Sequence, residues 1–272
     1  MKTIGMIVPT VDNIFFAKIA YEAEKFLKER GYLTFIASCQ NKAGNEKDYV
    51  KKMQEVCDGI LCISGLEQIE EGLIKTDYPF VLIDRTPKSG QDFAVCANDD
   101  YEACRNAVEF LIEKGCEKIV LCPGYLAQGQ TAPRLEGYCR ALEDNGLPFR
   151  EQYVIRRSGT HNSEQETEQR IEELLHDGEQ IDGIIASSDR AAFGAITALE
   201  KVGCYVPEDV KLITFDNSPY TAMSSPSITA MDRNPKRLAE AACSQLLAQI
   251  GHEPYDRKVI VDVSLIKRDS TR

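Results

Sequence analysis

The stretch Val81–Pro87 (VLIDRTP) has a counterpart in Leu212–Pro219 (LITFDNSP), far along the 272-residue chain. In both, an apolar strand-like run ends at or near an aspartate, and a short polar segment and a proline follow. Two further segments repeat in the same order: Met6–Pro9 (MIVP) with Val120–Pro123 (VLCP), and Val56–Leu61 (VCDGIL) with Gln180–Ile185 (QIDGII). Three paired segments in the same order indicate an internal duplication. We therefore expect two similar lobes, a division that also suits a chain of this length.

Between these segments the chain alternates strand-like and helix-like patterns almost without interruption. Continuous apolar runs such as Gly59–Ile63 and Phe80–Ile83 are typical of parallel strands that are buried on both faces. Further strands are predicted at Thr3–Val8, at Tyr153–Arg156 and, last in the chain, at Val259–Ile266. The alternation predicts an α/β fold in which each lobe is a doubly wound parallel sheet with helices on both faces.

Composition narrows the function classes. The apolar fraction of 43% and charged fraction of 28% are typical of a globular protein, and no apolar run approaches the roughly 18 residues of a membrane span. The net charge of −11 argues against direct DNA binding, because such binding depends on neutralising phosphates. The ten cysteines form no C-x-x-C pair, which favours buried thiols in the cytoplasm and neither disulfides nor a metal site.

Ligand binding is expected at the carboxyl ends of the parallel strands. In open parallel sheets these ends form the usual binding edge, and a cleft between two lobes is a common small-molecule site. Asp84 and Asp216 follow matching strands and are expected to face one such cleft. Because the chain has no phosphate-binding glycine loop, nucleophile elbow or zinc-protease motif, we expect it not to be an enzyme.

Motifs along the whole chain resemble those of the lactose/galactose-repressor (LacI/GalR) family and its relatives, the periplasmic sugar-binding proteins. They are Thr3–Pro9, Asn13–Phe16 (NIFF), Asp58–Ile60, Ile83–Arg85 (IDR), Arg134–Tyr138 (RLEGY), Ser188–Ala195 (SDRAAFGA), Ile213–Asn217 (ITFDN) and Val263–Thr271 (VSLIKRDST). The resemblance implies the type I periplasmic-binding-protein-like fold, with a three-crossing hinge. It implies an N-terminal lobe of residues 1–100 plus 232–256 and a C-terminal lobe of residues 101–231 plus 257–272.

The resemblance also implies a function. The chain is expected to be the ligand-sensing domain of a transcription regulator that works as a homodimer and uses no cofactor. Its DNA-binding headpiece, a helix-turn-helix segment, would precede Met1 and is expected to be absent from this chain. Closure of the lobes on the ligand would be coupled to DNA binding. The alternative is a secreted sugar-binding protein of a transporter. Sugars, purines, sugar phosphates and peptide-like molecules all remain open as ligands.

In the N-terminal lobe the resemblance implies five ligand-binding residues: Asn13, Phe15, Phe16, Asp84 and Arg85. An aromatic face can stack on the apolar face of a sugar or base, while a carboxylate accepts hydrogen bonds from hydroxyls and a guanidinium donates a planar fork. The alternative for the two phenylalanines is the core face of the following helix. The alternative for Asp84 is a turn or cap residue.

In the C-terminal lobe the implied residues are Arg134, Ser188, Asp189, Asp216 and Arg233. Asp216 matches the family's acceptor for ligand hydroxyls, and Ser188 stands where many relatives have Asn. Asp189 could instead cap the following helix, and Arg233 could be a solvated loop charge. If Arg233 joins the site, three guanidiniums favour a sugar acid or sugar phosphate. If the aspartates neutralise them, a neutral sugar is favoured.

Overall fold

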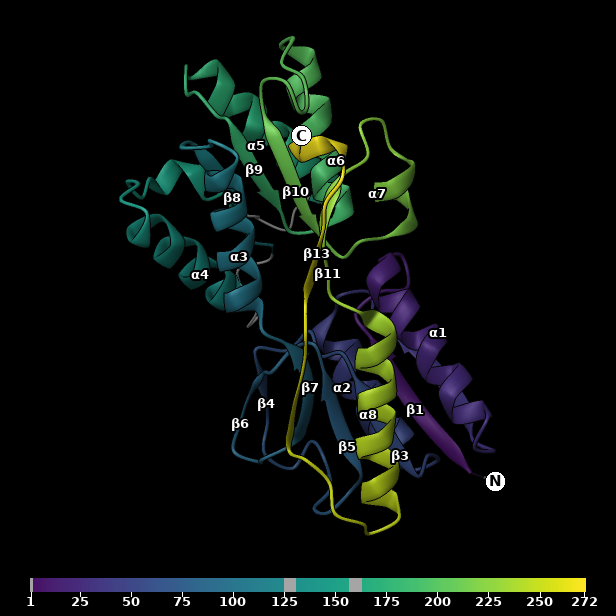
Figure 1. The fold of residues 1–272 in the computed structure, drawn as a ribbon. Helices are drawn as coiled ribbons and strands as arrows, with labels where there is room; N and C mark the ends of the chain where they lie inside the picture. Colours follow the sequence, from purple (N-terminus) through teal and green to yellow (C-terminus); the bar gives the residue numbers. More distant parts are fainter. Residues whose placement is uncertain (1, 125–130, 157–162) are drawn as a thin grey trace. The chain divides into compact units, whose positions relative to one another are not determined.

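The computed structural model describes residues 2–124, 131–156 and 163–272, and the chain forms two compact units (Figure 1). We call Met1–Asn98 with Asn234–Asp262 lobe 1, and Asp99–Arg233 with Val263–Arg272 lobe 2. The last segment of lobe 1 thus extends to Asp262, whereas the sequence placed that boundary at residue 256. The difference is one strand, β12 (Lys258–Val261), which pairs with a strand of lobe 1.

Lobe 1 contains a six-stranded parallel sheet with the order β12-β7-β5-β3-β1-β2. Its remaining strands are β1 (Thr3–Val8), β2 (Leu33–Ser38), β3 (Gly59–Cys62), β5 (Phe80–Ile83) and β7 (Ala94–Asn98). Its helices are α1 (Ile14–Lys28), α2 (Ala43–Met53) and α8 (Pro235–Ile250), and a small two-stranded sheet joins β4 (Gln68–Ile69) to β6 (Lys88–Ser89).

Alternate residues of each central strand of lobe 1 enter different cores. Ile4 and Met6 of β1 pack with α1 and α8, whereas Ile7 packs with the core that includes Val50 and Met53 of α2. Helices α1 and α8 contact each other, as Figure 1 shows. The sheet is therefore covered on both faces, which explains why its strands are apolar without interruption.

Lobe 2 contains a five-stranded sheet with the order β13-β11-β10-β9-β8, in which only β13 runs antiparallel. Its strands are β8 (Ile119–Cys122), β9 (Gly183–Ala186), β10 (Lys211–Phe215), β11 (Thr229–Asp232) and β13 (Ser264–Ile266). Its helices are α3 (Asp100–Glu113), α4 (Thr131–Asp144), α5 (Ser163–His176), α6 (Asp189–Lys201) and α7 (Pro219–Met223), with short 3-10 turns at Glu151–Tyr153 and Asp269–Thr271.

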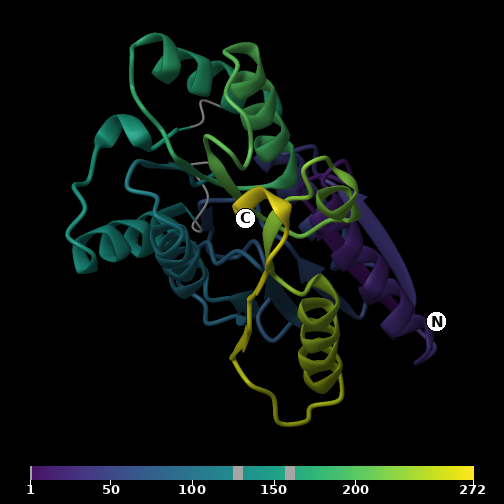
Figure 2. The same cartoon turned by 45° about the horizontal axis from the view of Figure 1, so that its top comes forward.

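Two helix pairs cover the sheet of lobe 2, one on each face (Figure 1 and Figure 2). Glycine permits both pairs to pack closely. A Cβ atom at Gly137 would lie 2.3 Å from the carbonyl oxygen of Tyr101, and one at Gly194 would lie 2.2 Å from that of Glu164. Any side chain at these positions would push α4 from α3 or α6 from α5, which gives the glycines of the RLEGY and SDRAAFGA motifs a packing role.

The predicted fold class is confirmed, but several elements differ. The strand predicted at Val259–Ile266 is two strands, β12 and β13, which belong to different sheets. The strand predicted at Tyr153–Arg156 is a 3-10 turn followed by a single bridge from Val154 to Leu121. Within the part of the chain that the structure describes, no helix is long and apolar enough to span a bilayer.

Candidate functional site

The repeated aspartates end equivalent strands in the same backbone turn. Asp84 follows β5 with φ of 69°, and Asp216 follows β10 with φ of 84°. The N–H of Asp84 donates to the carbonyl of Cys96 in β7 (2.8 Å), and that of Asp216 donates to the carbonyl of Met231 in β11 (3.2 Å). Aspartate tolerates this left-handed conformation better than most residues. The repeat in the sequence is therefore also a repeat of backbone geometry at the carboxyl edge of each sheet.

In lobe 1, Arg85 is the buried cation of the strand ends, with only 8% of the residue exposed. Its Nη1 donates to the carbonyl of Ser64, which follows β3, at 3.4 Å. Its Nε lies 4.0 Å from Oδ2 of Asp84, and its guanidinium lies 5.0 Å from the ring centre of Phe16. An aromatic ring from α1 and the carboxylate and guanidinium of two adjacent residues after β5 therefore meet at one edge of this sheet.

A buried carboxyl group supports this edge. Glu46, on α2, accepts hydrogen bonds from the hydroxyl of Ser64 (2.5 Å) and the N–H of Gly65 (2.7 Å). Burial raises the pKa of Glu46, although these hydrogen bonds and the charge of Arg85 act in the opposite direction. The sequence analysis missed Glu46, because a single Glu in a polar helix carries no signal of burial. Its contacts fix the loop that supplies the acceptor for Arg85.

The other residues predicted in lobe 1 have structural contacts of their own. The side-chain oxygen of Asn13 caps α1 by accepting from the N–H of Phe15 (2.8 Å) and of Phe16 (3.4 Å). Phe15 and Phe16 are both buried in the core beneath α1. Phe16 also contacts Arg85, so it belongs to the core and to the strand-end group at once.

In lobe 2, four charged residues form one ion-pair network: Asp100, Arg134 and Arg233, which are buried, and Asp216, which is partly buried. Oδ1 of Asp100 lies 3.0 Å from both Nε and Nη2 of Arg134, and its Oδ2 lies 3.8 Å from Nη2 of Arg233. Arg233 also donates from Nη1 to Oδ1 of Asp216 at 3.2 Å. We call these four residues the Asp–Arg network.

Burial makes the Asp–Arg network a strong constraint. Exposure is 4% for Arg134, 6% for Asp100 and 3% for Arg233. The alternative that Arg233 is a solvated loop charge is therefore wrong. The guanidinium of Arg134 also lies 3.9 Å from the ring centre of Phe215, and its Nη1 donates to the carbonyl of Ser187 at 3.4 Å. Charges this deeply buried require partners, so each arginine is held in one orientation.

Asp100 was missed by the sequence analysis. It lies two residues after β7, a strand that was not predicted because its sequence, AVCAN, is short and ends in a polar residue. The run Asn98-Asp99-Asp100 was the available signal. Asp99 caps α3, which leaves the side chain of Asp100 to pair with arginines.

Ser188, and not Asp189, is the cap residue of α6. Ser188 caps α6 by accepting from the N–H of Ala191, so the alternative that Asp189 is the cap is wrong. Oδ2 of Asp189 accepts from the N–H of Ser218 at 3.1 Å, and its Oδ1 has no hydrogen-bond partner among the described residues. Burial, with the nearby charge of Asp216 as a smaller cause, raises the pKa of Asp189 to about 6.

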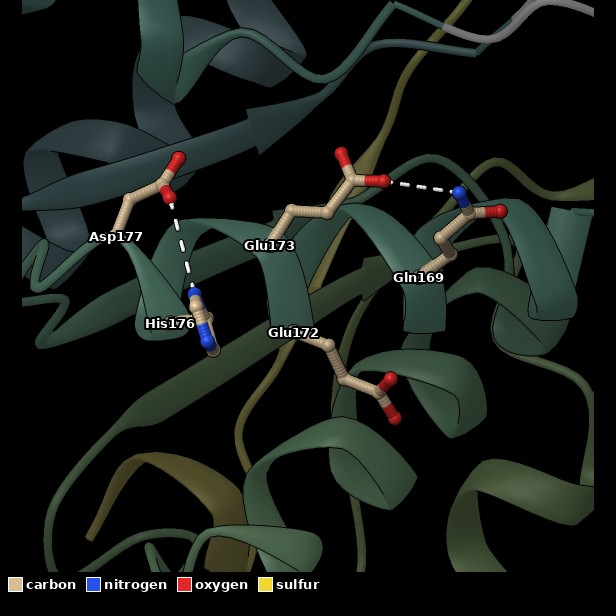
Figure 3. A pocket seen from close by; sticks show the side chains of 5 residues that line it. All are labelled: Gln169, Glu172, Glu173, His176 and Asp177. Carbon is tan, nitrogen blue, oxygen red and sulfur yellow. Dashed lines mark hydrogen bonds and ion pairs between the residues drawn. The ribbon is translucent and has the colours of Figure 1, made fainter.

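A surface hollow lies along α5 (Figure 3). It is lined by Gln169, Glu172, Glu173, His176 and Asp177. The side chains of His176 and Asp177 are 92% and 77% exposed. Solvated side chains from one stretch of helix do not fix a ligand, and the hollow includes no predicted site residue. Among the described residues, no group of three or more His, Cys, Asp or Glu could hold a metal ion.

Comparison with known proteins identifies relatives along nearly the whole chain. Residues 108–271 match the periplasmic binding protein-like domain family. Catabolite control protein A of Priestia megaterium is 29% identical over 95% of this chain and 78% of its own length. The HTH-type transcriptional repressor PurR of Vibrio atlanticus (strain LGP32) is 27% identical over 98% of this chain and 81% of its own length.

A solved structure extends the likeness to every part of the fold. The periplasmic binding protein/LacI transcriptional regulator from Alkaliphilus metalliredigens QYMF, complexed with D-xylulofuranose, has a TM-score of 0.86 and 26% identity, with 100% of both chains covered. The relatives named here are regulators, which decides against the transporter alternative. The chain belongs to the periplasmic binding protein-like domain family, as the effector-binding domain of a LacI/GalR-family transcription regulator.

Proposed function

We propose that the effector is a small polyhydroxylated molecule, a sugar or a sugar derivative, bound by the strand-end residues of both lobes. The proposed contacts in lobe 1 are Asn13, Phe16, Asp84 and Arg85, with Phe15 packed against Phe16. Those in lobe 2 are Arg134, Ser188, Asp189, Asp216 and Arg233. The observation that carries this proposal is the fixed Asp–Arg network, which supplies oriented donors and acceptors beside the aromatic ring of Phe215.

Sugars suit such a group because they present hydroxyls in fixed directions and one apolar face. Carboxylates accept from hydroxyls, guanidiniums donate to hydroxyl and ring oxygens, and aromatic rings cover C–H groups. Since the protein already orients these side chains, binding would cost little further ordering. The relative from Alkaliphilus metalliredigens, solved with D-xylulofuranose, supports a sugar as the chemical class.

A thermal-shift screen tests the proposal. The library contains neutral pentoses and hexoses, the matching sugar acids and phosphates, nucleobases and amino acids. Ligands that bind only the folded state raise its Tm in proportion to the logarithm of their concentration. We expect the largest shifts from neutral sugars. Shifts given only by nucleobases or amino acids would overturn the choice of sugar but leave the regulator domain intact.

We infer that the response of the regulator to the effector is closure of the lobes, which alters DNA binding by the regulator. The net charge of −11 supports a ligand-sensing role for this chain and not a DNA-contacting role, since an acidic surface repels DNA. We also infer a cytoplasmic location. Eight of the ten cysteines are buried, and burial raises the pKa of Cys96 and Cys104 to about 12, which is typical of unreactive thiols.

We further propose a homodimer that uses the β2 edge of lobe 1. β2 is the last strand of its sheet, and Leu33, Phe35 and Ile36 on it are exposed. Nearby exposed apolar residues include Tyr21 on α1, a helix that packs against β2. Exposed apolar edges are typical of contact surfaces. Light scattering should give a dimer for the wild type and a monomer for Phe35→Glu; a wild-type monomer at tens of micromolar would contradict the proposal.

A further inference from the structure

The charges around the Asp–Arg network are balanced. Arg134, Arg233 and the neighbouring Arg268 face Asp100, Asp216 and Asp189. We propose that Asp100 determines specificity: by neutralising Arg134 and Arg233 together, it makes lobe 2 select an uncharged effector and reject anions. The inference rests on the proposed function in taking this network as part of the effector site, and it names the charge class of the ligand.

Both oxygens of Asp100 are engaged by arginines. Oδ1 takes two N–H groups of Arg134, and Oδ2 is the oxygen nearer to Arg233. A phosphate or carboxylate group would seek the same guanidinium edges. Asp100 therefore occupies the place that an anionic ligand would otherwise take.

Burial gives this competition its strength. Asp100, Arg134 and Arg233 are all more than nine-tenths buried. A buried charge interacts far more strongly than one in water, so an incoming anion must either displace Asp100 or remain beside uncompensated carboxylates. A neutral hydroxyl avoids both costs, because it needs only a hydrogen bond and carries no charge for the carboxylates to repel.

The other carboxylates act in the same direction. Oδ1 of Asp189 has no hydrogen-bond partner among the described residues, and Asp216 lies close enough to raise the pKa of Asp189. At pH 7.5 the Asp189 carboxyl is ionised, since its pKa is about 6, and the carboxyl group of Asp216 lies nearby. They can accept hydrogen bonds from hydroxyls, but they repel a phosphate. In lobe 1 the positive charge of Arg85 is likewise offset, because the carboxyl groups of Asp84 and Glu46 lie near it.

The test measures binding of inorganic phosphate, which requires no knowledge of the effector. Asp100→Asn keeps the shape of the side chain but removes its charge. With 20 mM phosphate in place of sodium chloride at equal ionic strength and pH 7.5, we expect the Tm of this variant to rise by about 2 °C or more, and that of the wild type to stay unchanged. Titration followed by ³¹P NMR line broadening should show at least tenfold tighter phosphate binding by the variant.

The matched control is Asp144→Asn. Asp144 also bridges two arginines of lobe 2, with Oδ1 2.8 Å from Nη2 of Arg140 and Oδ2 3.6 Å from Nη2 of Arg105. Those arginines are solvated, with side chains 53% and 34% exposed. Asp144→Asn should therefore gain no phosphate binding. A gain equal to that of Asp100→Asn would show a general charge effect and overturn the proposal.

Two further variants keep the test decisive. Adding Arg233→Gln to Asp100→Asn removes the excess charge, so the phosphate response should disappear; a response that persists overturns the proposal. If circular dichroism shows that Asp100→Asn does not fold, Asp216→Asn, which also strips a partner from Arg233, should gain phosphate binding in its place. Folded variants that gain none, or a wild type that binds phosphate equally well, overturn the proposal. Since this assay uses no sugar, its failure leaves the proposed function standing, whereas failure of all sugars to bind would overturn only that function.

Discussion

The two lobes share a backbone design but differ in the charges at their strand ends. In lobe 1, Asp84 is followed by Arg85, whose guanidinium lies near Phe16. In lobe 2, Asp216 is followed by Asn217, whose side-chain oxygen accepts from Arg268 at 2.6 Å, while arginines from other segments reach the network. The turn is therefore the repeated feature. The side chains placed on it have diverged, and lobe 2 has acquired the more strongly coupled set.

This difference predicts unequal costs of mutation. In lobe 2, replacing one arginine of the network removes an ion-pair partner from the buried carboxylate of Asp100. In lobe 1 a single guanidinium is supported by a carbonyl, a ring and nearby carboxyl groups, so the loss of one contact removes less.

The largest effect is expected for Arg134→Ala. The change leaves Asp100 buried beside Arg233 alone, and removal of one partner of a buried ion pair costs about 3–5 kcal/mol of unfolding free energy. Urea unfolding at pH 7.5 measures it. The control is Arg140→Ala, whose ion pairs are exposed and should contribute less than about 1 kcal/mol. Equal losses in the two variants would contradict the strong coupling claimed for lobe 2.

A smaller effect of opposite sign is expected for Asp189→Asn. Burial raises the pKa of Asp189 from 3.8 to about 6. The folded protein thus holds this proton more tightly than the unfolded chain, and the contribution of Asp189 to the unfolding free energy falls as the pH rises from about 4 to about 6. At pH 7.5 the ionised group costs about 1–3 kcal/mol, so the Asn variant should be more stable by that order and equal to wild type near pH 4.

Urea titrations of both proteins at pH 4, 5 and 7.5 provide the measurement. Asn retains an acceptor for the N–H of Ser218, so the hydrogen bond is preserved. A variant that is less stable than wild type at pH 7.5, or a difference independent of pH, would show that Asp189 is ionised without cost.

The smallest effects are expected at the caps that the two lobes share. Asn13 caps α1 and Ser188 caps α6, each at the carboxyl end of a strand. Asn13→Ala should cost about 1 kcal/mol, and Ser188→Ala should cost less because its hydrogen bond is longer, 3.4 Å against 2.8 Å. Chemical unfolding resolves the two. If Ser188→Ala weakens sugar binding without loss of stability, Ser188 is chiefly a ligand contact.

The local sequence pattern was sufficient to predict the bounds of buried strands. The strands at Thr3–Val8 and Phe80–Ile83 have the predicted bounds, because continuous apolar runs leave few alternatives. The strands β7 (AVCAN) and β11 (TAMD) were missed, since small and polar residues dilute their patterns. Their loss also hid Asp100, which follows β7. Ion pairs between residues 17 or more positions apart leave no local trace in sequence, so the Asp–Arg network required the structure.

We propose that matching turns in both lobes serve one neutral polyhydroxylated effector. Calorimetric titration with the neutral sugar that gives the largest thermal shift tests it directly, on wild type, Asp84→Asn and Asp216→Asn. Asn tolerates the left-handed turn, so each change removes mainly a charged acceptor. We expect one sugar per chain and affinity lowered at least tenfold by either change, as is typical for loss of a charge-assisted hydrogen bond. Binding that survives either change, or two sugars per chain, would contradict it.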